Sequence, residues 1–202
     1  MADIEDQVRR AYAGGAAEYT RLLGDIADMD ERDRDRISGW ALQIDGPVID
    51  AGCGPGHWTD FLHQRGVDIC GVDLVPEFIE MARSRFPAVP FRTSSFHTLA
   101  LQDESLSGVL AWYSLIHLQP TVLPTALAEF RRVLRPDGRL LVGFFEAPAA
   151  EPFQHAVTEA FYWSVPRMRV LLENAGFKVL DTEMRRDEGG RRPHAAMTAT
   201  AL

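Results

Sequence analysis

From Gly46 onward, short apolar segments alternate with amphipathic segments, and this alternation constrains the fold more than any other feature of the chain. Short apolar segments favour strands, and a helix between two strands is the connection that a parallel sheet requires. The alternation therefore predicts an α/β fold with a doubly wound, Rossmann-like sheet. Its strands are expected at residues 47–50, 67–73, 90–94, 108–113 and 139–146.

Proline, serine and glycine mark the ends of the helices between these strands. Pro76 suits a first helical turn because its ring fixes φ, and RPDG at Arg135–Gly138 is expected to end the helix that begins near Pro124. Ser164 is expected to cap the start of the last helix, and Gly176 to end it in a left-handed conformation.

Two extended segments follow this last helix. Residues 177–185 and 192–202 are separated by the polar turn DEGG at 187–190, which predicts an antiparallel terminal hairpin on a mostly parallel sheet. Arginines and acidic residues mix around the turn, so we expect a solvated turn there. The arginines are Arg185, Arg186, Arg191 and Arg192.

Residues 1–40 are expected to be helical, with an interruption at Gly14 and Gly15. The run DMDERDRDR at residues 28–36 alternates in sign, which is typical of a solvated helix face. The chain has 202 residues, of which 46% are hydrophobic, so one domain is expected. Residues 1–40 would be its cap and residues 41–202 its ligand-binding core.

Composition excludes several classes of function. No apolar stretch is long enough to cross a membrane, and the net charge of −8 disfavours binding to nucleic acid or to anionic lipid. Two cysteines are too few for a disulfide framework, and the first residues do not resemble a secretion signal. No cluster has the spacing of metal ligands. We expect a cytoplasmic protein with a small-molecule partner and no metal.

A glycine-rich loop follows the first expected strand, in the sequence VIDAGCGPG at residues 48–56. Glycines let the backbone approach a ligand closely, and the N-terminus of the following helix offers free N–H groups to an anion. Dinucleotide-binding folds use a related pattern with Gly or Ala at its sixth position. Here that position is His57, so the loop alone leaves the ligand open.

Two carboxylates narrow the choice of ligand. Asp50, just before the loop, would repel a pyrophosphate but pair with an ammonium group that lies beside a carboxylate, as in an amino acid. Asp73, at the end of the second expected strand, is placed to accept hydrogen bonds from two ribose hydroxyls. An amino acid joined to a ribose suggests S-adenosyl-L-methionine.

The chain resembles the class I S-adenosylmethionine-dependent methyltransferases over residues 40–202. The segments that carry the resemblance are VIDAGCGPG (48–56), GVDLVPEFIEMAR (71–83), SGVLAWYSLIHL (107–118), EFRRVLRPDGRLLVGF (129–144) and LLENAGFKV (171–179). The resemblance implies a seven-stranded sheet whose last strand is reversed. It also implies methyl transfer to a small-molecule acceptor by in-line displacement, with S-adenosyl-L-homocysteine as the product.

The resemblance further implies which residues hold the cofactor: the loop and Asp50 the methionine end, Asp73 the ribose and Leu74 the adenine. Many relatives carry an acidic residue where Ser95 stands and an Asp where Ser107 stands, so adenine binding falls to the Ser95 hydroxyl and the Phe96 N–H. The full expected set is Tyr19, Asp50, Ala51, Gly52, Gly54, Asp73, Leu74, Ser95, Phe96, Ala111 and Trp112.

Few catalytic side chains are required, because the enzyme's main task is to align the nucleophile with the methyl group and sulfur and to exclude water. Trp112 and Tyr113 are candidates to face the sulfonium. His117 is the candidate general base if the nucleophile is an oxygen or a carbon acid. The aromatic residues at 144–163 suit an apolar or aromatic acceptor, or alternatively a homodimer contact.

Two other functions stay open. The loop glycines and Asp73 alone would allow an NAD-dependent oxidoreductase, although Asp50 and His57 oppose it. The departures at Ser95 and Ser107 would allow a non-catalytic module that binds S-adenosylmethionine as a sensor or as a partner subunit.

Overall fold

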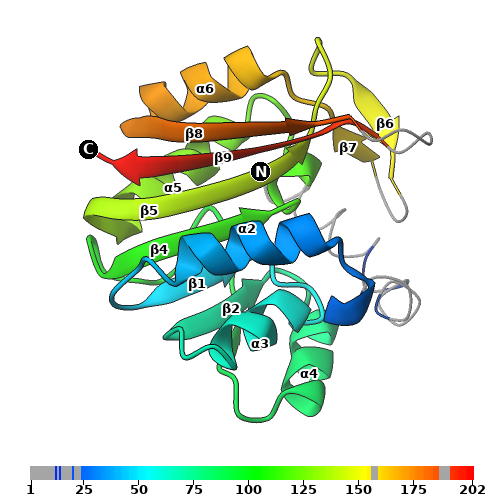
Figure 1. Ribbon diagram of the computed structural model, residues 1–202, viewed down its shortest axis with the longest axis vertical. Coiled ribbons are helices and arrows are strands. Elements are labelled where there is room, and N and C mark those ends of the chain that lie inside the picture. The colour runs from blue at the N-terminus through cyan, green and yellow to red at the C-terminus, as the bar shows by residue number, and fades with distance from the viewer. Residues whose placement is uncertain (1–11, 13, 15–19, 21–23, 156–158, 187–191) are drawn as a thin grey trace.

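The computed structural model describes residues 12, 14, 20, 24–155, 159–186 and 192–202. A seven-stranded sheet forms its centre, in the order β3-β2-β1-β4-β5-β9-β8, and a separate two-stranded hairpin pairs β6 with β7 (Figure 1). The strands are β1 Val48–Ala51, β2 Ile69–Asp73, β3 Phe91–Thr93, β4 Leu106–Trp112, β5 Leu134–Phe145, β6 Pro152–Gln154, β7 Glu159–Phe161, β8 Phe177–Arg185 and β9 His194–Ala201.

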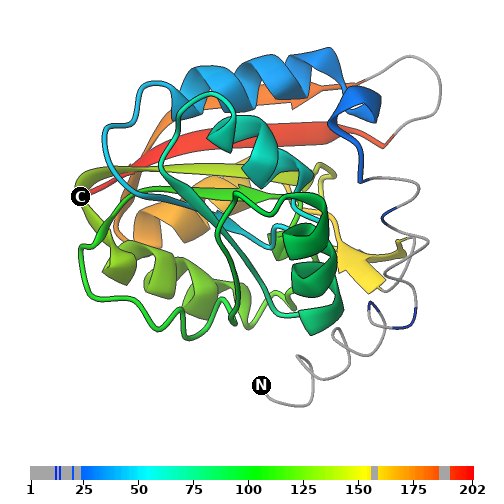
Figure 2. The ribbon, with the colours of Figure 1, turned by 90° about the horizontal axis from the view of Figure 1, so that it is seen from below.

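Helices cover both faces of the sheet (Figure 2). One face carries α2 and α3, and the other carries α5 and α6. The helical elements are η1 Ile26–Asp28, α2 Glu31–Ala41, α3 His57–His63, α4 Pro76–Arg85, η2 Leu115–His117, α5 Leu123–Val133 and α6 Val165–Asn174. The doubly wound, Rossmann-like α/β fold expected from the sequence is confirmed.

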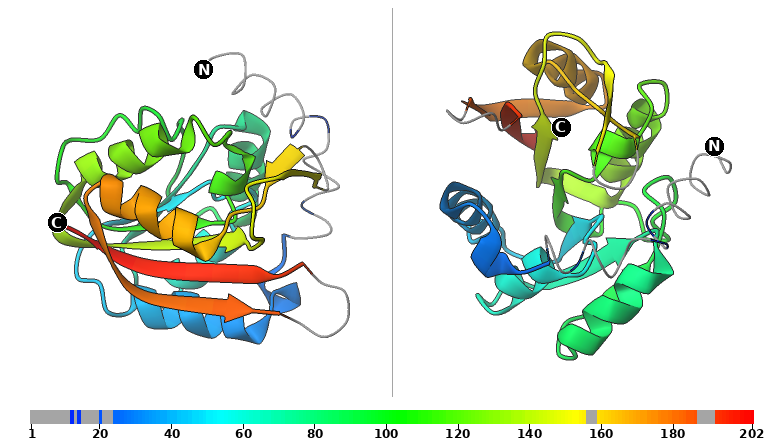
Figure 3. Two further views of the ribbon diagram at one scale, coloured as in Figure 1. Left: turned by 90° about the horizontal axis from the view of Figure 1, so that it is seen from above. Right: turned by 90° about the vertical axis from the view of Figure 1, so that its right-hand side faces the viewer.

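Strands β1 to β5 are parallel to one another, and β9 is antiparallel to both β5 and β8. The terminal hairpin is therefore confirmed, and Figure 3 shows it at one edge of the sheet, with α2 on one face and α6 on the other. The DEGG turn lies outside the described residues. The strand β9 reverses direction, which lets the chain end beside β5 without another crossover helix.

The expected strand at 139–146 begins earlier than its sequence indicated. The helix α5 does end before RPDG, at Val133, but β5 starts at once with Leu134, which pairs with Leu106 of β4. Asp137 adopts a φ of 63°, and the β4–β5 register shifts between Leu106 and Gly108. RPDG therefore forms an irregularity within the strand instead of a loop before it.

The helix ends follow the expected chemistry. Pro76 occupies the first turn of α4, and the Ser164 hydroxyl accepts a hydrogen bond from the Arg167 N–H, 3.4 Å away, at the start of α6. Gly176 has a φ of 87°, the left-handed conformation that ends a helix. These three local predictions are confirmed.

The N-terminal region is not one helix up to residue 40. Among the described residues, Tyr12, Gly14 and Thr20 are helical, but a 3₁₀ turn over Ile26–Asp28 is followed by extended backbone at Met29, and α2 begins only at Glu31. The Asp30 carboxylate caps α2 by accepting a hydrogen bond from the Arg32 N–H at 2.9 Å.

The charged run at residues 28–36 is only partly the solvated face that was expected: Asp28, Glu31, Arg32 and Asp35 are exposed, but Asp33 and Arg36 are paired with the sheet. Arg36 is paired with Asp181 at 2.8 Å and with Glu183 at 2.9 Å, both on β8, and its side chain is only 15% exposed. Asp33 is paired with Arg185, whose side chain is 10% exposed, so Arg185 does not belong to a solvated turn either. These ion pairs attach α2 to the edge of the sheet.

In the part of the chain that the structure describes, no helix is long and apolar enough to cross a membrane.

The larger core cluster gives a test of the packing. Phe130 of α5 is fully buried between the sheet and Phe96, with their ring centroids 6.1 Å apart. Phe130→Ala should lower the free energy of unfolding by about 3–5 kcal/mol, because the cavity left behind cannot close. Leu180→Ala, at a side chain 44% exposed, should change it by less than about 0.5 kcal/mol. Urea unfolding measures both, and equal effects would refute this packing.

Candidate functional site

The ends of β1, β2 and β4 meet at one edge of the sheet, where two adjoining cavities open. In a doubly wound sheet, this carboxyl edge at the change of strand order is where ligands bind. The first cavity is lined by Asp73, Leu74, Ser95 and Phe96, and the second by Asp50, His57 and Trp58, among others. Residues common to both cavities are Gly52, Gly54, Trp112, Tyr113 and His117.

The glycine loop needs its glycines for conformation and for space. Gly52, Gly54 and Gly56 have φ values of 81°, 52° and 85°, a region that side chains disfavour. A Cβ on Gly52 would lie 2.3 Å from the Cβ of Ser114 and 2.9 Å from the ring of Phe96. The loop therefore leaves a shallow cradle of bare backbone at the boundary of the two cavities.

Asp73 ties this loop to the second strand. Its carboxylate accepts one hydrogen bond from the Gly54 N–H and one from the Val75 N–H, each at 2.9 Å. Burial raises the pKa of Asp73 to about 6, although these backbone bonds work against that rise. The carboxylate faces the first cavity and keeps lone pairs for further donors.

Asp50 is a buried carboxyl group at the end of β1. The Thr59 hydroxyl of α3 donates to its Oδ2 at 2.7 Å, and the residue is 2% exposed. Burial raises the pKa of Asp50 to about 7, and the negative charge of Asp73 raises it further. A cation placed in the second cavity beside Asp50 would restore its charged form.

The first cavity contains a polar atom that no protein group satisfies. The hydroxyl of Ser114 is buried without a hydrogen-bond partner among the described residues, and it lines the cavity beside Gly52. Buried hydroxyls are normally hydrogen-bonded, so a polar ligand atom is expected to meet this one. Sequence reasoning missed Ser114, although its position two residues after Trp112, at the end of a central strand, could have pointed to it.

Trp112 and Tyr113, at the end of β4, each depend on a particular local geometry. Trp112 pairs with Gly143 of β5, and a Cβ on Gly143 would lie 2.7 Å from the Trp112 ring, so only glycine leaves room for the indole. Tyr113 has a φ of 54°, a strained conformation for a residue with a side chain. Both side chains line both cavities.

His117 has both ring nitrogens engaged. Its Nδ1 donates to the Glu159 carbonyl at 3.0 Å, because a carbonyl can only accept, and its Nε2 then accepts from the Tyr12 hydroxyl at 2.6 Å. Burial lowers the pKa of His117 to about 4. His117 is therefore neutral near pH 7, and it holds Tyr12 of the N-terminal segment against the first cavity.

Seven rings follow one another along the wall of the second cavity, and we call them the aromatic belt. The centroids of neighbouring rings are 5.6 Å (His57–Trp58), 6.5 Å (Trp58–Trp112), 5.3 Å (Trp112–Tyr113), 4.9 Å (Tyr113–Phe145), 5.8 Å (Phe145–His155) and 5.4 Å (Phe145–His194) apart. The Nδ1 atoms of His57 and His155 are buried without a partner among the described residues. The belt gives the second cavity an aromatic wall.

Most of the residues expected at the site are brought together by the fold. Ala51 and Ala111 are exceptions, because both are fully buried in the core and line neither cavity. Tyr19 lies outside the described residues. Ser107 is buried at the amino end of β4, against Gly46 and away from the site, so its identity carries no argument about the ligand.

No three His, Cys, Asp or Glu side chains gather in a way that could hold a metal ion within the described ranges. Cys53 of the glycine loop is buried, and burial raises the pKa of its thiol. The thiol is therefore protonated, as a packing residue would be.

The fold is that of an α/β protein with a Rossmann-like sheet, and its candidate ligand site lies at the carboxyl edge of that sheet. A profile described as "Methyltransferase domain" matches residues 48–138. An O-methyltransferase, rstn1, from Aspergillus nomiae is 31% identical over 160 residues, which cover 71% of this chain and 69% of that protein. The chain belongs to the class I S-adenosylmethionine-dependent methyltransferase family.

Other relatives match over a smaller share of their own length. The malonyl-[acyl-carrier protein] O-methyltransferase of Serratia marcescens is 32% identical over 145 residues, 70% of this chain and 55% of that protein. The chain spans about half or less of the length of most of these relatives. A Burkholderia thailandensis N1-methyltransferase, solved with 1,6-didemethyltoxoflavin and S-adenosylhomocysteine, shares the fold with a TM-score of 0.76, 24% identity and coverage of 97% of this chain and 89% of that one.

The buried Asp50 predicts a pH-dependent gain in stability on its removal. In the folded protein the pKa of Asp50 is about 7, whereas its ordinary value is 3.8. The folded state therefore binds the Asp50 proton more tightly than the unfolded state does. The contribution of this proton to the free energy of unfolding is fully present below about pH 4. It is lost as the pH rises to 7, and the total loss is at most roughly 4 kcal/mol. Asp50→Asn should therefore raise the free energy of unfolding at pH 8 by about 1–3 kcal/mol, and hardly at pH 4, in urea unfolding without ligand.

Asp45→Asn is the matched control, because Asp45 is exposed before β1. It should shift stability by less than about 0.5 kcal/mol at both pH values. A gain for Asp50→Asn of the same size at pH 4 and pH 8 would contradict the assignment of the effect to a buried charge.

Proposed function

We propose that this chain binds S-adenosylmethionine across the two cavities and transfers its methyl group to a small apolar or aromatic acceptor. The observation that carries the proposal is the pair of buried carboxylates, Asp50 and Asp73, on either side of a glycine loop. Both have pKa values raised by burial, because the hydrogen bonds from Thr59 to Asp50 and from Gly54 and Val75 to Asp73 do not offset the loss of solvation, so each would gain from further positive or hydrogen-donating partners. An ammonium group and a ribose diol supply those partners.

The residues present fit this cofactor on chemical grounds. Asp50 would pair with its ammonium group, and the bare backbone at Gly52 and Gly54 would lie against the methionine end. Asp73 would accept from the ribose, and Leu74 and Phe96 would enclose the adenine. The orphaned Ser114 hydroxyl gains a polar partner in the same pocket. The bound cofactor supplies an electrophilic methyl group on a sulfonium ion.

The protein's own contribution is alignment and the exclusion of water. Trp112 and Tyr113 stand at the boundary of the two cavities, where an acceptor in the second cavity would meet a cofactor that extends from the first. Their π faces favour the sulfonium cation and lie beside the acceptor. A rigid aromatic boundary holds the nucleophile in line at little entropic cost during reaction.

We assign His117 to holding the N-terminal segment and not to proton abstraction. Its one basic nitrogen, Nε2, already accepts the Tyr12 hydroxyl at 2.6 Å, and Tyr12 lines the first cavity. This contact supports residues 1–40 as a cap over the cofactor. Proton abstraction by His117 would require the cap to release Tyr12 first.

Binding of the cofactor is tested by thermal unfolding with S-adenosylmethionine, S-adenosylhomocysteine and NADH in parallel. At about 100 times its dissociation constant, a ligand should stabilise the protein by roughly 2.7 kcal/mol, or on the order of 5–10 °C. We expect this shift with both adenosyl compounds, its loss in Asp50→Asn and its retention in Asp45→Asn. A shift with NADH alone would favour an oxidoreductase instead.

Catalysis is tested separately, because binding without transfer would describe a sensor or partner subunit. Protein incubated with methyl-labelled S-adenosylmethionine and a panel of aromatic acceptors should give labelled product and S-adenosylhomocysteine in equal amounts. Tight binding with no product from any acceptor class would favour the non-catalytic alternative.

A further inference from the structure

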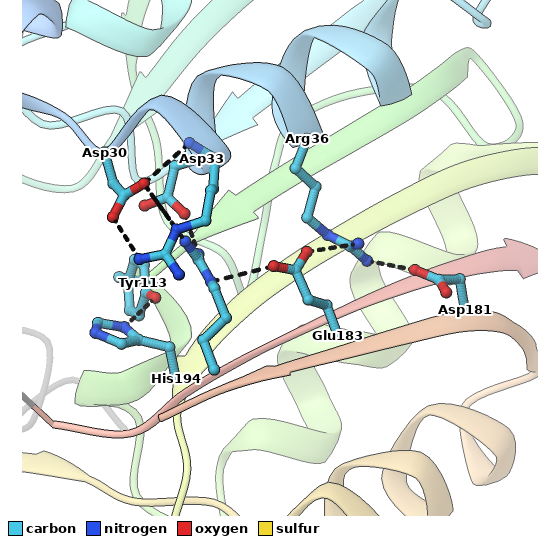
Figure 4. Close-up of polar contacts among 9 residues, drawn as sticks. Asp30, Asp33, Arg36, Tyr113, Asp181, Glu183 and His194 are labelled. Carbon is cyan, nitrogen blue, oxygen red and sulfur yellow. Dashed lines mark hydrogen bonds and ion pairs between the residues drawn. The ribbon is translucent and has the colours of Figure 1, made fainter. Parts of the chain in front are cut away.

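Tyr113 and His194 form a short hydrogen-bonded pair inside the second cavity. The Tyr113 hydroxyl lies 2.5 Å from Nδ1 of His194, and both side chains line the cavity (Figure 4). They are 81 positions apart in the chain, one at the end of β4 and the other at the start of β9. Neither residue belongs to the glycine loop or to the carboxylates proposed to hold the cofactor.

The backbone places the Tyr113 hydroxyl where a reacting group would lie. Tyr113 follows β4 in a strained conformation, with a φ of 54°, that its backbone bond from the N–H to the Gly143 carbonyl at 3.0 Å helps to maintain. Its ring also contacts Trp112 and Phe145, so the phenol has little freedom to turn. Strain kept at a site boundary is typical of a functional position.

His194 lies beside a network of ion pairs that joins α2 to β8. In the strand register it is paired with Phe145 on one side and with Arg185 on the other. Arg185 is itself paired with Asp33 of α2 and with Glu183 at 3.2 Å, and it lies 3.9 Å from Asp30 (Figure 4).

Carboxylates exceed guanidinium groups by one in the connected network of Figure 4. The carboxylates are Asp30, Asp33, Asp181 and Glu183, and the guanidinium groups are Arg32, Arg36 and Arg185. On the other side of the cavity stand His155 and Arg192, whose guanidinium lies 4.7 Å from the Phe153 ring. Within this network Asp33 interacts electrostatically with His194, so its carboxylate would favour a positive charge formed on that imidazole during the reaction.

We propose that Tyr113 and His194 act together as the general base, and that the acceptor is a flat aromatic compound with an acidic hydroxyl group. This inference rests on the proposed function. As the acceptor oxygen forms its bond to the methyl carbon, the carbon–sulfur bond breaks and its electron pair stays on sulfur. The acceptor proton passes to the Tyr113 oxygen while the Tyr113 proton passes to Nδ1 of His194, which becomes an imidazolium ion.

The aromatic belt favours a planar acceptor. The proton relay formed by Tyr113 and His194 favours an acceptor whose reacting group is an acidic hydroxyl. The rings of Trp58 and Trp112 are inclined by 69°, so a planar ring would lie face-on to one of them and edge-on to the other, the two arrangements that aromatic pairs prefer. The unpartnered Nδ1 atoms of His57 and His155 offer hydrogen bonds to polar substituents at the two ends of the belt. A phenol-type hydroxyl between them would reach the Tyr113 oxygen.

The test uses 4-nitrophenol as the acceptor probe, because its phenolate form absorbs visible light. The full-length protein is saturated with S-adenosylhomocysteine, which cannot react, at a pH about one unit below the pKa of the free probe. In the wild type we expect the bound probe to show the phenolate band, because Tyr113 and His194 take its proton. Tyr113→Phe and His194→Gln should each reduce that band about tenfold or more.

Two matched variants and one binding measurement separate this inference from the proposed function. Tyr162→Phe and His63→Gln alter the same residue types outside both cavities and should retain the band. Calorimetry should give all four variants an affinity for S-adenosylhomocysteine within about threefold of the wild type, which also reports that they fold.

Three other outcomes would each overturn one component of the proposal. Failure of S-adenosylhomocysteine to bind the wild type would overturn the proposed function itself. Normal cofactor binding without binding of millimolar 4-nitrophenol would overturn the hydroxyl-bearing aromatic acceptor. A phenolate band that is absent in the wild type, or that persists in Tyr113→Phe or His194→Gln, would overturn the relay.

Discussion

The hydrogen bond from the Gly54 N–H to the Asp73 carboxylate, 2.9 Å long, is the contact on which the site depends. It joins the loop after β1 to the end of β2, and it holds three glycines in conformations that the loop would not keep in isolation. Because the loop is fixed there, α3 begins at His57 and brings Thr59 to Asp50. Asp73 thus fixes the loop backbone and also faces the first cavity, and Asp50, held by Thr59, faces the second.

Two carboxylates so close together are costly in a protein without ligand. Burial raises the pKa of both, and the charge of Asp73 adds to the cost of ionising Asp50. A ligand whose ammonium group lay beside Asp50 would remove the free-energy cost of ionising that carboxyl. The cost of keeping Asp50 buried in the free protein and the affinity for a cationic ligand therefore have the same physical origin.

The parts of the structure that sequence predicts are those set by local chemistry. The strands, the capped helices and the terminal hairpin follow from apolar segments and from the φ preferences of Pro76 and Gly176. The early start of β5 was missed because RPDG is a strong local turn signal that pairing with Leu106 overrides. Asp50, Asp73 and the glycines can be predicted as one site because they are close in sequence, whereas the pairing of His194 with Tyr113 cannot, because 81 positions separate them.

Contacts between residues distant in sequence also form the charged wall of the second cavity. The charged run of α2 has the pattern of a solvated helix face, yet Asp33 meets Arg185 across 152 positions of sequence, and Arg36 meets Glu183. Removing one partner of such a partly buried pair would leave the other charge without its counter-ion. The pairs therefore anchor α2 over β8 and keep Asp33 near His194. A segment that contributes nothing to the glycine loop thus sets the electrostatic environment of the side chain proposed to receive the acceptor's proton.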